Sequence, residues 1–176
     1  MLTSTMIESP VGELTLVATE RGLRALLWPT ELERELRAVV GARPGDVTTI
    51  AVGELSTTLH PVLTQTVLEL HEYFAGGRQS FDVPLDPVGT PFQHRAWMAL
   101  REIPYGATVS YGEQARRLGD VKLARAVGAA NGRNPISIIV PCHRVIGSTG
   151  KLTGFGGGLG TKDWLLRHES NPLFQM

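Results

Sequence analysis

The chain has 176 residues, 42% of them hydrophobic, and a formal net charge of zero, which suits one fair-sized domain or two small ones. Its first residues lack the basic start and apolar stretch of a secretory signal. No segment has the roughly 20 apolar residues that a membrane span requires. We therefore expect a cytoplasmic protein with no membrane partner.

The net charge of zero combines two unlike halves. Residues 1–87 carry 6 Lys and Arg against 12 Asp and Glu, a net charge of −6, whereas residues 88–176 carry 11 against 5, a net charge of +6. A basic half indicates a polyanionic ligand. Ordinary solvated charged faces are the alternative, and composition alone leaves it open.

The first 87 residues are predicted to begin with an antiparallel meander. Alternating apolar and polar residues, separated by turn residues, predict three strands at residues 3–8, 13–19 and 23–28. A fourth segment, residues 81–85, is typical of an edge strand.

Two helices are predicted in the same half. Helical spacing of apolar residues indicates a short charged helix at residues 31–40 and a longer one at residues 61–74, which ends at Gly76-Gly77. Residues 41–46 break the pattern, and residues 86–89 are the best candidate for a linker. The sequence thus predicts two domains, residues 1–87 and 88–176.

Helix signals sharpen beyond this linker. Residues 90–93 form a capping box with proline at the first helical position, which predicts a helix through about Ile103. A second capping box at residues 110–113 opens a short helix to Leu118, and a glycine turn leads into a third helix at residues 121–131. Two short helices joined by a tight turn favour helix-turn-helix; an ordinary helical hairpin fits the pattern equally well.

The third of these helices is unusual in composition. Its small residues include Ala124, Ala126 and Gly128, and one long cation, Arg125, lies among them. Small side chains let a helix approach a nucleic-acid backbone or a shallow groove closely, while one cation reaches in. Tight packing between helices also favours Ala and Gly, so the composition leaves both readings open.

The single cysteine, Cys142, follows the apolar, strand-like residues 136–140 and directly precedes His143. A lone cysteine cannot form an internal disulfide, and one soft ligand is too few for a structural zinc site. We interpret it as a nucleophile activated by a neighbouring base. A buried free thiol that acts as a small hydrophobe is the competing interpretation.

Several motifs occur in one order between Thr90 and Glu169: residues 92–97, IPYG, SYGE, ARAVG, NP, PCHRV, a glycine-rich loop and WLLRHE. In this segment the chain resembles the O6-alkylguanine-DNA alkyltransferases, also called methylated-DNA–protein-cysteine methyltransferases. The resemblance implies an α/β (α+β) fold. Residues 1–87 would form a ribonuclease-H-like antiparallel sheet with helices, and residues 88–176 a winged helix-turn-helix-like, mostly helical domain that holds the active-site cysteine.

The resemblance also implies direct-reversal DNA repair. The family transfers the alkyl group of O6-alkylguanine, and by implication of O4-alkylthymine, irreversibly to the cysteine that corresponds to Cys142, so each molecule reacts once. His143 would act as the base through a water molecule, oriented by Glu169 as in a hydrolytic triad. Asn134 would brace the active-site loop, although any Asn-Pro pair also favours a turn.

The implied partner is double-stranded DNA, bound from its minor groove. Tyr111 would crowd the 3′ phosphate and Arg125 would fill the gap left by the flipped nucleotide, while Ala124, Ala126 and Gly128 would let the helix approach. No obligate protein partner is expected, and side-by-side assembly of several molecules on DNA is left open.

The implied substrate pocket runs from Cys142 to Gly158, with Val145, Phe155 and Gly156 among its residues, and also involves Pro141 just before this range. Carbonyls of Cys142 and Val145 would accept from the guanine amino group. Many relatives have tyrosine where this chain has Phe155, so the contact to O6 would fall to a backbone amide such as that of Gly156, or to water. No cofactor and no metal are expected, because the family's zinc site needs cysteines that this chain lacks.

Three other functions fit parts of the sequence. A non-catalytic lesion binder of the alkyltransferase-like kind would lack the cysteine, and a methyl-phosphotriester sensor would need further cysteines in an added domain. A thiol hydrolase that uses Cys142 and His143 on a small ester or amide would turn over repeatedly and would not need Tyr111 or Arg125. The glycine-rich residues 154–160 do not complete a phosphate-loop motif.

Overall fold

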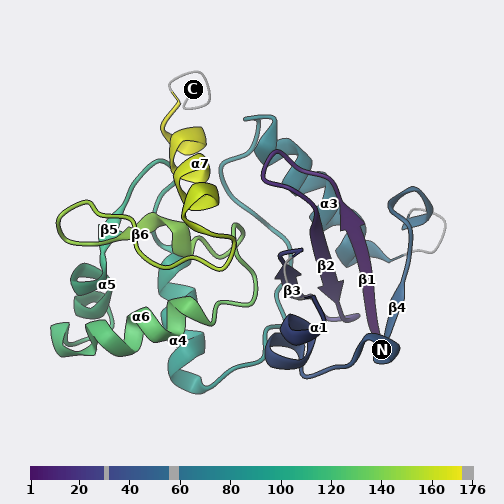
Figure 1. The fold of residues 1–176 in the computed structure, drawn as a ribbon, viewed down its shortest axis with the longest axis horizontal. Coiled ribbons are helices and arrows are strands. Elements are labelled where there is room, and N and C mark those ends of the chain that lie inside the picture. Colours follow the sequence, from purple (N-terminus) through teal and green to yellow (C-terminus); the bar gives the residue numbers. More distant parts are fainter. Residues whose placement is uncertain (30–31, 56–59, 172–176) are drawn as a thin grey trace. The chain divides into compact units, whose positions relative to one another are not determined.

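The computed structural model describes residues 1–29, 32–55 and 60–171. The chain divides into two compact units with the boundary between Val88 and Gly89, and Figure 1 shows the elements of each. Among the described helices, none combines the length and apolar character that a bilayer crossing demands.

The first unit is built on a four-stranded sheet of order β3-β2-β1-β4. The predicted meander is present, as β1 (Leu2–Ile7), β2 (Leu14–Ala18) and β3 (Leu23–Leu27), which pair antiparallel. The short strand β4 (Val47–Thr49) was not predicted, and it pairs parallel with β1. The sheet is therefore mixed, with one parallel pair at its edge.

Apolar side chains on one face of this sheet pack against the segment after β3. Val17 and Ala25 are cross-strand partners and therefore share a face, where they pack in a buried cluster with Leu36 and Val40. The first residue of the helix predicted at residues 31–40 lies outside the described residues. Its described portion is α1 (Leu32–Glu35), which continues as a π-helical turn, η1 (Leu36–Val40), and ends at Gly41 with φ of 72°.

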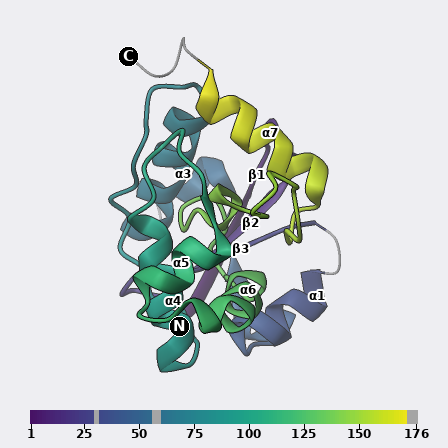
Figure 2. The same ribbon diagram turned by 90° about the vertical axis from the view of Figure 1, so that its left-hand side faces the viewer.

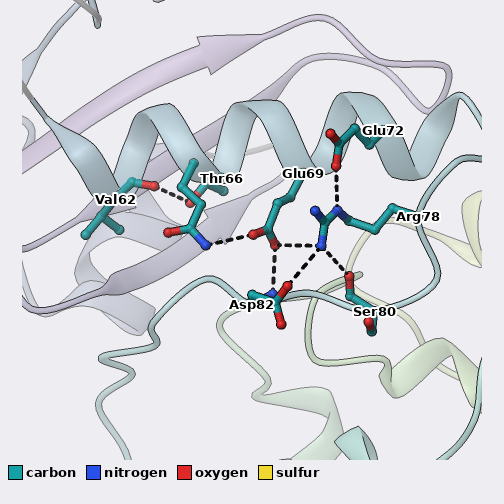
Figure 3. A network of polar contacts seen from close by, with 8 residues as sticks. Val62, Thr66, Glu69, Glu72, Arg78, Ser80 and Asp82 are labelled. Atoms are coloured by element: carbon teal, nitrogen blue, oxygen red, sulfur yellow. Dashed lines mark hydrogen bonds and ion pairs between the residues drawn. The ribbon is translucent and has the colours of Figure 1, made fainter.

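Helix α3 (Pro61–Phe74) occupies the predicted residues and packs against β1, β2 and β3 (Figure 1). Its buried Glu69 accepts hydrogen bonds from the Gln65 side chain at 2.7 Å and from the Asp82 amide at 2.8 Å. Arg78 lies beside it and donates to Glu72 at 2.7 Å, so this network ties the chain after the helix to its buried side (Figure 3). Two 3-10 turns precede the helix, η2 (Pro44–Asp46) and η3 (Val52–Glu54).

The edge strand predicted at residues 81–85 is wrong. Only Leu85 forms a bridge, to Leu23, whose amide donates to the Pro84 carbonyl at 2.8 Å. Because proline has no N–H, Pro84 cannot continue a ladder of hydrogen bonds. The segment remains extended and ends at Asp86, which Arg24 holds at 2.6 Å.

The second unit is mostly helical, as predicted. Its elements are α4 (Pro91–Arg101), β5 (Val109–Ser110), α5 (Tyr111–Arg117), η4 (Val121–Leu123), α6 (Ala124–Gly132), η5 (Cys142–Arg144), β6 (Val145–Ile146) and α7 (Leu159–Ser170). The reciprocal capping box of Thr90 and Gln93 is present at the start of α4, and the Ser110 hydroxyl caps α5. The predicted starts of these helices are therefore correct.

Helices α4, α5 and α6 pack together (Figure 2). The Trp97 indole donates to the Ala130 carbonyl at 2.8 Å, and the amide side chains of Gln114 and Asn131 donate to each other at 3.1 and 2.8 Å. All these groups are buried. Satisfied buried polar pairs fix the relative position of the helices, because a misaligned partner would leave an unpaired polar group.

Candidate active site around Cys142

A two-stranded parallel sheet that was not predicted organises the site. Strand β5 pairs with β6 through Val109–Val145 and Ser110–Ile146. Helix α5 begins with Tyr111 directly after β5, and η5 with Cys142 lies directly before β6. This pairing places the start of α5 next to the cysteine segment.

The apolar residues 136–140 are not strand-like, contrary to prediction. They form a buried turn in which the Val140 amide donates to the Ile136 carbonyl at 2.9 Å, and Ile138 has φ of 74°. The Asn134 side chain donates to the Val140 carbonyl at 2.7 Å and accepts from the Ile136 amide at 3.0 Å. Asn134 thus satisfies backbone groups that a strand ladder would have paired.

Residues Cys142, His143 and Arg144 then form one 3-10 turn rather than an extended segment. Three residues per turn separate neighbouring side chains by about 120°. His143 and Arg144 both contact Glu169 of α7, whereas the Cys142 thiol hydrogen-bonds to Asn134 and Ser137. Pro141, which precedes the turn, has φ of −83° and ψ of 65°.

The Cys142 side chain is buried, with 8% of the residue exposed. Burial raises the pKa of the Cys142 thiol above its ordinary value of 9.0, and hydrogen bonding to Asn134, the charge of Lys162 and hydrogen bonding to Ser137 oppose this effect. The thiol is therefore protonated in the free protein. Its proton has to leave when the sulfur reacts.

His143 and Glu169 form a buried pair, with 2.7 Å between His143 Nε2 and Glu169 Oε1. The exposed fractions of the two side chains are 0% and 1%. Burial lowers the pKa of His143, although the hydrogen bond to Glu169 favours the protonated ring. Within the described parts of the chain, His143 Nδ1 has no hydrogen-bond partner. Neutral His143 that donates from Nε2 to Glu169 would leave Nδ1 as an acceptor.

Glu169 also accepts two hydrogen bonds from Arg144. Arg144 Nε donates to Oε2 at 2.9 Å and Nη2 to Oε1 at 3.0 Å. Burial would raise the pKa of Glu169, but the hydrogen bonds from His143 and Arg144 hold it well below its ordinary value of 4.5. The carboxylate is therefore charged over the whole physiological range.

Lys162 lies fully buried beneath the site. Its Nζ donates to the Val145 carbonyl at 2.6 Å and to the Thr153 carbonyl at 2.9 Å. Burial lowers the pKa of Lys162, and its interaction with Cys142 opposes that effect. The ammonium group thus joins strand β6 to the loop before α7 and favours the thiolate form of Cys142.

The predicted pocket residues differ in exposure. Pro141 and Val145 are buried, Phe155 is half-buried and Gly156 is exposed. The Phe155 ring lies edge-on to the His143 ring, with 6.5 Å between centroids. The Cys142 and Val145 carbonyls each accept one hydrogen bond already, from the Val145 amide and from Lys162. A carbonyl has two lone pairs, so each retains capacity for a second donor.

The residues expected to touch DNA lie on α6 and at the start of α5. Arg125 and Ala126 are exposed, while Ala124 and Gly128 are half-buried. Gly128 faces the Tyr111 ring, since a Cβ built on it would lie in ordinary van der Waals contact, 3.8 Å from Cδ1 of Tyr111.

Tyr111 is linked to the active-site loop, since its hydroxyl group lies 3.0 Å from Oγ1 of Thr153. The structure thus gathers Cys142, His143, Glu169 and Asn134 and joins Tyr111 to their loop. Arg125 stays apart, because it makes no hydrogen bond or ion pair to another described residue.

Two family models account for nearly the whole chain. The ribonuclease-like domain of 6-O-methylguanine DNA methyltransferase matches residues 2–87, and the DNA-binding domain of the same family matches residues 91–171. The chain belongs to the 6-O-methylguanine DNA methyltransferase family.

Individual relatives in this methyltransferase family agree. The methylated-DNA–protein-cysteine methyltransferase of Methanosarcina acetivorans is 43% identical over 94% of this chain and 97% of its own length. That of Mycobacterium tuberculosis is 46% identical over 94% of this chain and 90% of its own length. A crystal structure of the M. tuberculosis protein OGT in complex with DNA aligns with a TM-score of 0.79 and 44% identity, over 96% of this chain and 92% of that one.

Sequence reasoning missed two charged residues of this methyltransferase site, Arg144 and Lys162. Arg and Lys side chains normally lie in solvent, so the residue type of neither one predicts its burial. A detectable signal exists for Lys162, which lies three residues before Leu165 and seven before Glu169 on the inner side of α7. Among the described residues, no group of three or more His, Cys, Asp or Glu side chains is placed to hold a metal ion.

Proposed function

We propose that this methylated-DNA–protein-cysteine methyltransferase repairs O6-alkylguanine by taking the alkyl group onto Sγ of Cys142, once per molecule. Repair by alkyl transfer follows from membership of the family. The observation that carries the residue assignment is the buried pair of His143 and Glu169 at 2.7 Å, directly after the single cysteine.

The proposed step is a direct displacement at the alkyl carbon. The thiol proton moves to Nδ1 of His143, through a water molecule, and Glu169 stabilises the imidazolium that forms. A bond forms between Sγ and the alkyl carbon while the bond from that carbon to guanine O6 breaks. The departing guanine anion takes up a proton from its surroundings, and the His143 imidazolium gives up one proton in return. Guanine and neutral His143 are thereby restored, and the thioether on Cys142 remains.

The thioether explains why the reaction would stop after one turn. A sulfur–carbon bond of this kind offers water no good leaving group, so the Cys142 thiol is not regenerated. The protein would be consumed stoichiometrically, without any cofactor.

DNA is proposed to bind to α5 and α6 through its minor groove. The exposed Arg125 would enter the duplex where the nucleotide leaves, and the small residues Ala124, Ala126 and Gly128 would allow the close approach. Tyr111 would contact the phosphate on the 3′ side. No obligate protein partner is part of this proposal, and we place the reaction in the cytoplasm.

The pocket is proposed to hold the flipped base beside Phe155. Phenylalanine keeps the shape of the family's tyrosine but has no hydroxyl to donate to O6. The exposed Gly156 would offer its backbone amide to the developing charge instead. O4-alkylthymine would use the same pocket.

A titration of the protein with duplex DNA that carries labelled O6-methylguanine tests this function. We expect label transfer to stop at one equivalent per protein molecule and to be absent in Cys142→Ser. Continued loss of label with an excess of lesion would instead indicate a thiol hydrolase or another enzyme that turns over.

A further inference from the structure

One oxygen of Glu169 is shared between two donors. Oε1 lies 2.7 Å from His143 Nε2 and 3.0 Å from Arg144 Nη2, while Oε2 accepts from Arg144 Nε at 2.9 Å. The guanidinium thus binds the carboxylate through both oxygens in a fork. Both partners are buried, with 7% and 1% of their side chains exposed.

This arrangement bears on the charge of His143. A buried carboxylate with no other cation would draw a proton onto the imidazole to form an ion pair. Arg144 already neutralises Glu169, so a proton on His143 would add a net positive charge to a buried group of side chains.

On this geometry we propose that Arg144 is a positioning residue, which occupies Glu169 so that His143 stays neutral with its Nδ1 free to receive the thiol proton. The inference rests on the proposed alkyl transfer and names the group that makes His143 a base. An imidazolium could not accept that proton at all.

Other charged and titratable groups around His143 agree with this assignment. Glu169 from α7 is the group that favours the protonated ring, whereas Arg144 beside it and Lys162 from α7 disfavour it. The Cys142 thiol is the neighbouring acid, and the Tyr105 hydroxyl lies near the charges of Arg144 and Glu169. Arg144 is the cation that contacts the carboxylate directly.

Arg144 could instead serve only to tie the unit together. Its Nη1 donates to the Ile103 carbonyl at 2.7 Å, just after α4, and its Cζ lies 5.8 Å from the centre of the Tyr105 ring. Loss of these contacts would reduce stability. It would not by itself change the protonation of His143, so the two roles can be separated.

The test compares wild type, Arg144→Lys and Arg144→Met by the single-turnover rate of methyl transfer from duplex O6-methylguanine between pH 5 and 9. The acid limb of the pH profile is the fall of this rate at low pH, where His143 becomes protonated. We expect Arg144→Met to move the acid limb to higher pH and to react about tenfold more slowly near it, since one pH unit changes the neutral fraction of His143 about tenfold. Arg144→Lys keeps the charge but not the fork and should shift the limb less. An equal loss of rate at every pH, with no shift of the limb, would overturn the proposal.

Nitrogen-15 NMR of the histidine rings gives a second readout that needs no variant to fold. In the wild-type protein at pH 7, His143 should show one protonated and one unprotonated ring nitrogen, with the proton on Nε2. An imidazolium in the wild type would also overturn the proposal. If Arg144→Met folds, its His143 ring should take up the second proton at a higher pH than the wild-type ring does.

Arg24→Met is the matched control, because it removes an arginine from a carboxylate partner, Asp86, in the other unit. It should leave the acid limb unchanged. If wild type transfers no methyl group to Cys142, the proposed function itself has failed; if it does and the limb of Arg144→Met stays in place, only the role of Arg144 has failed.

Discussion

Glu69 and Glu169 are both buried carboxylates, one in each unit, and both lie beside an arginine. Glu69 binds Gln65 and the Asp82 amide, and Arg78 approaches it only to 3.8 Å, since that arginine donates mainly to Glu72 (Figure 3). Glu169 receives a full arginine fork and also a histidine next to the single cysteine. A buried carboxylate beside an arginine therefore does not by itself indicate a reactive site. A histidine that shares the carboxylate with the arginine does.

The largest effect is expected when Glu169 is replaced by glutamine, with the same replacement of Glu69 for comparison. Glu169→Gln should slow methyl transfer between about 10²- and 10⁴-fold, because His143 would lose the carboxylate that positions it as the general base, and such a base contributes about this much. Glu69→Gln should leave the transfer rate unchanged and cost about 1–3 kcal/mol of unfolding free energy, because it disturbs a buried hydrogen-bond network. Single-turnover kinetics and urea unfolding measure the two effects. A comparable loss of rate in both variants would remove the distinction.

Arg125 contrasts with Arg144 in the same unit, since it is exposed and makes no described ion pair. Arg125→Ala should slow transfer from duplex DNA on the order of 30-fold, because about 2 kcal/mol of the cost of flipping is no longer offset. The reaction with free O6-benzylguanine, which needs no flipping, should keep its rate.

The matched control for that experiment is Arg133→Ala, which removes another exposed cation at the end of α6. It should weaken DNA binding only through the lost charge. Equal effects of Arg125→Ala on the duplex and on the free base would place Arg125 outside the flipping step.

The resemblance to the family implies that Phe155 lies where many relatives have tyrosine. Phe155→Tyr should speed transfer about tenfold, because one hydrogen bond to the charge that develops on O6 contributes about 1.5 kcal/mol. Reactions with duplex DNA that carries O6-methylguanine, quenched at a series of times, measure the rate. An equal or slower rate in the variant would show that a backbone donor already serves O6.

A fall in pH should gradually lower the unfolding free energy of the unit that holds Glu169, and this is the smallest of the expected effects. The pKa of His143 is below its ordinary value of 6.5 in the folded protein, so the unfolded chain binds a proton that the folded chain does not, and stability falls as the pH drops below about 6.5. The lowered pKa of Glu169 extends the loss below about pH 4.5. Urea unfolding followed by tryptophan fluorescence should show this slope in wild type and a flatter one between pH 7 and 5 in His143→Gln. The same slope in both proteins would contradict it.

Local signals made the helices predictable. Thr90 and Ser110 cap the helices that they were expected to start, and α3 occupies residues 61–74, because caps and helical spacing act over a few residues. The pairings β1–β4 and β5–β6 were not predictable, since each joins two or three residues far apart in the sequence.

Buried turns and buried charges were also hidden from the sequence. Residues 136–140 look like a strand because a fully buried turn and a buried strand have the same apolar composition. The roles of Arg144 and Lys162 depend on which carbonyls and carboxylates the fold brings to them. The pair of Cys142 and His143 was visible because the two are adjacent, whereas Glu169 came only from the resemblance to the family.

The most direct test of the central claim is to locate the transferred group. After incubation with duplex DNA that carries O6-methylguanine, intact-mass and peptide analysis should show one added methyl group, on Cys142, and none in Cys142→Ser. Repair of the lesion with Cys142 unmodified, or with the methyl group on another residue, would contradict the account.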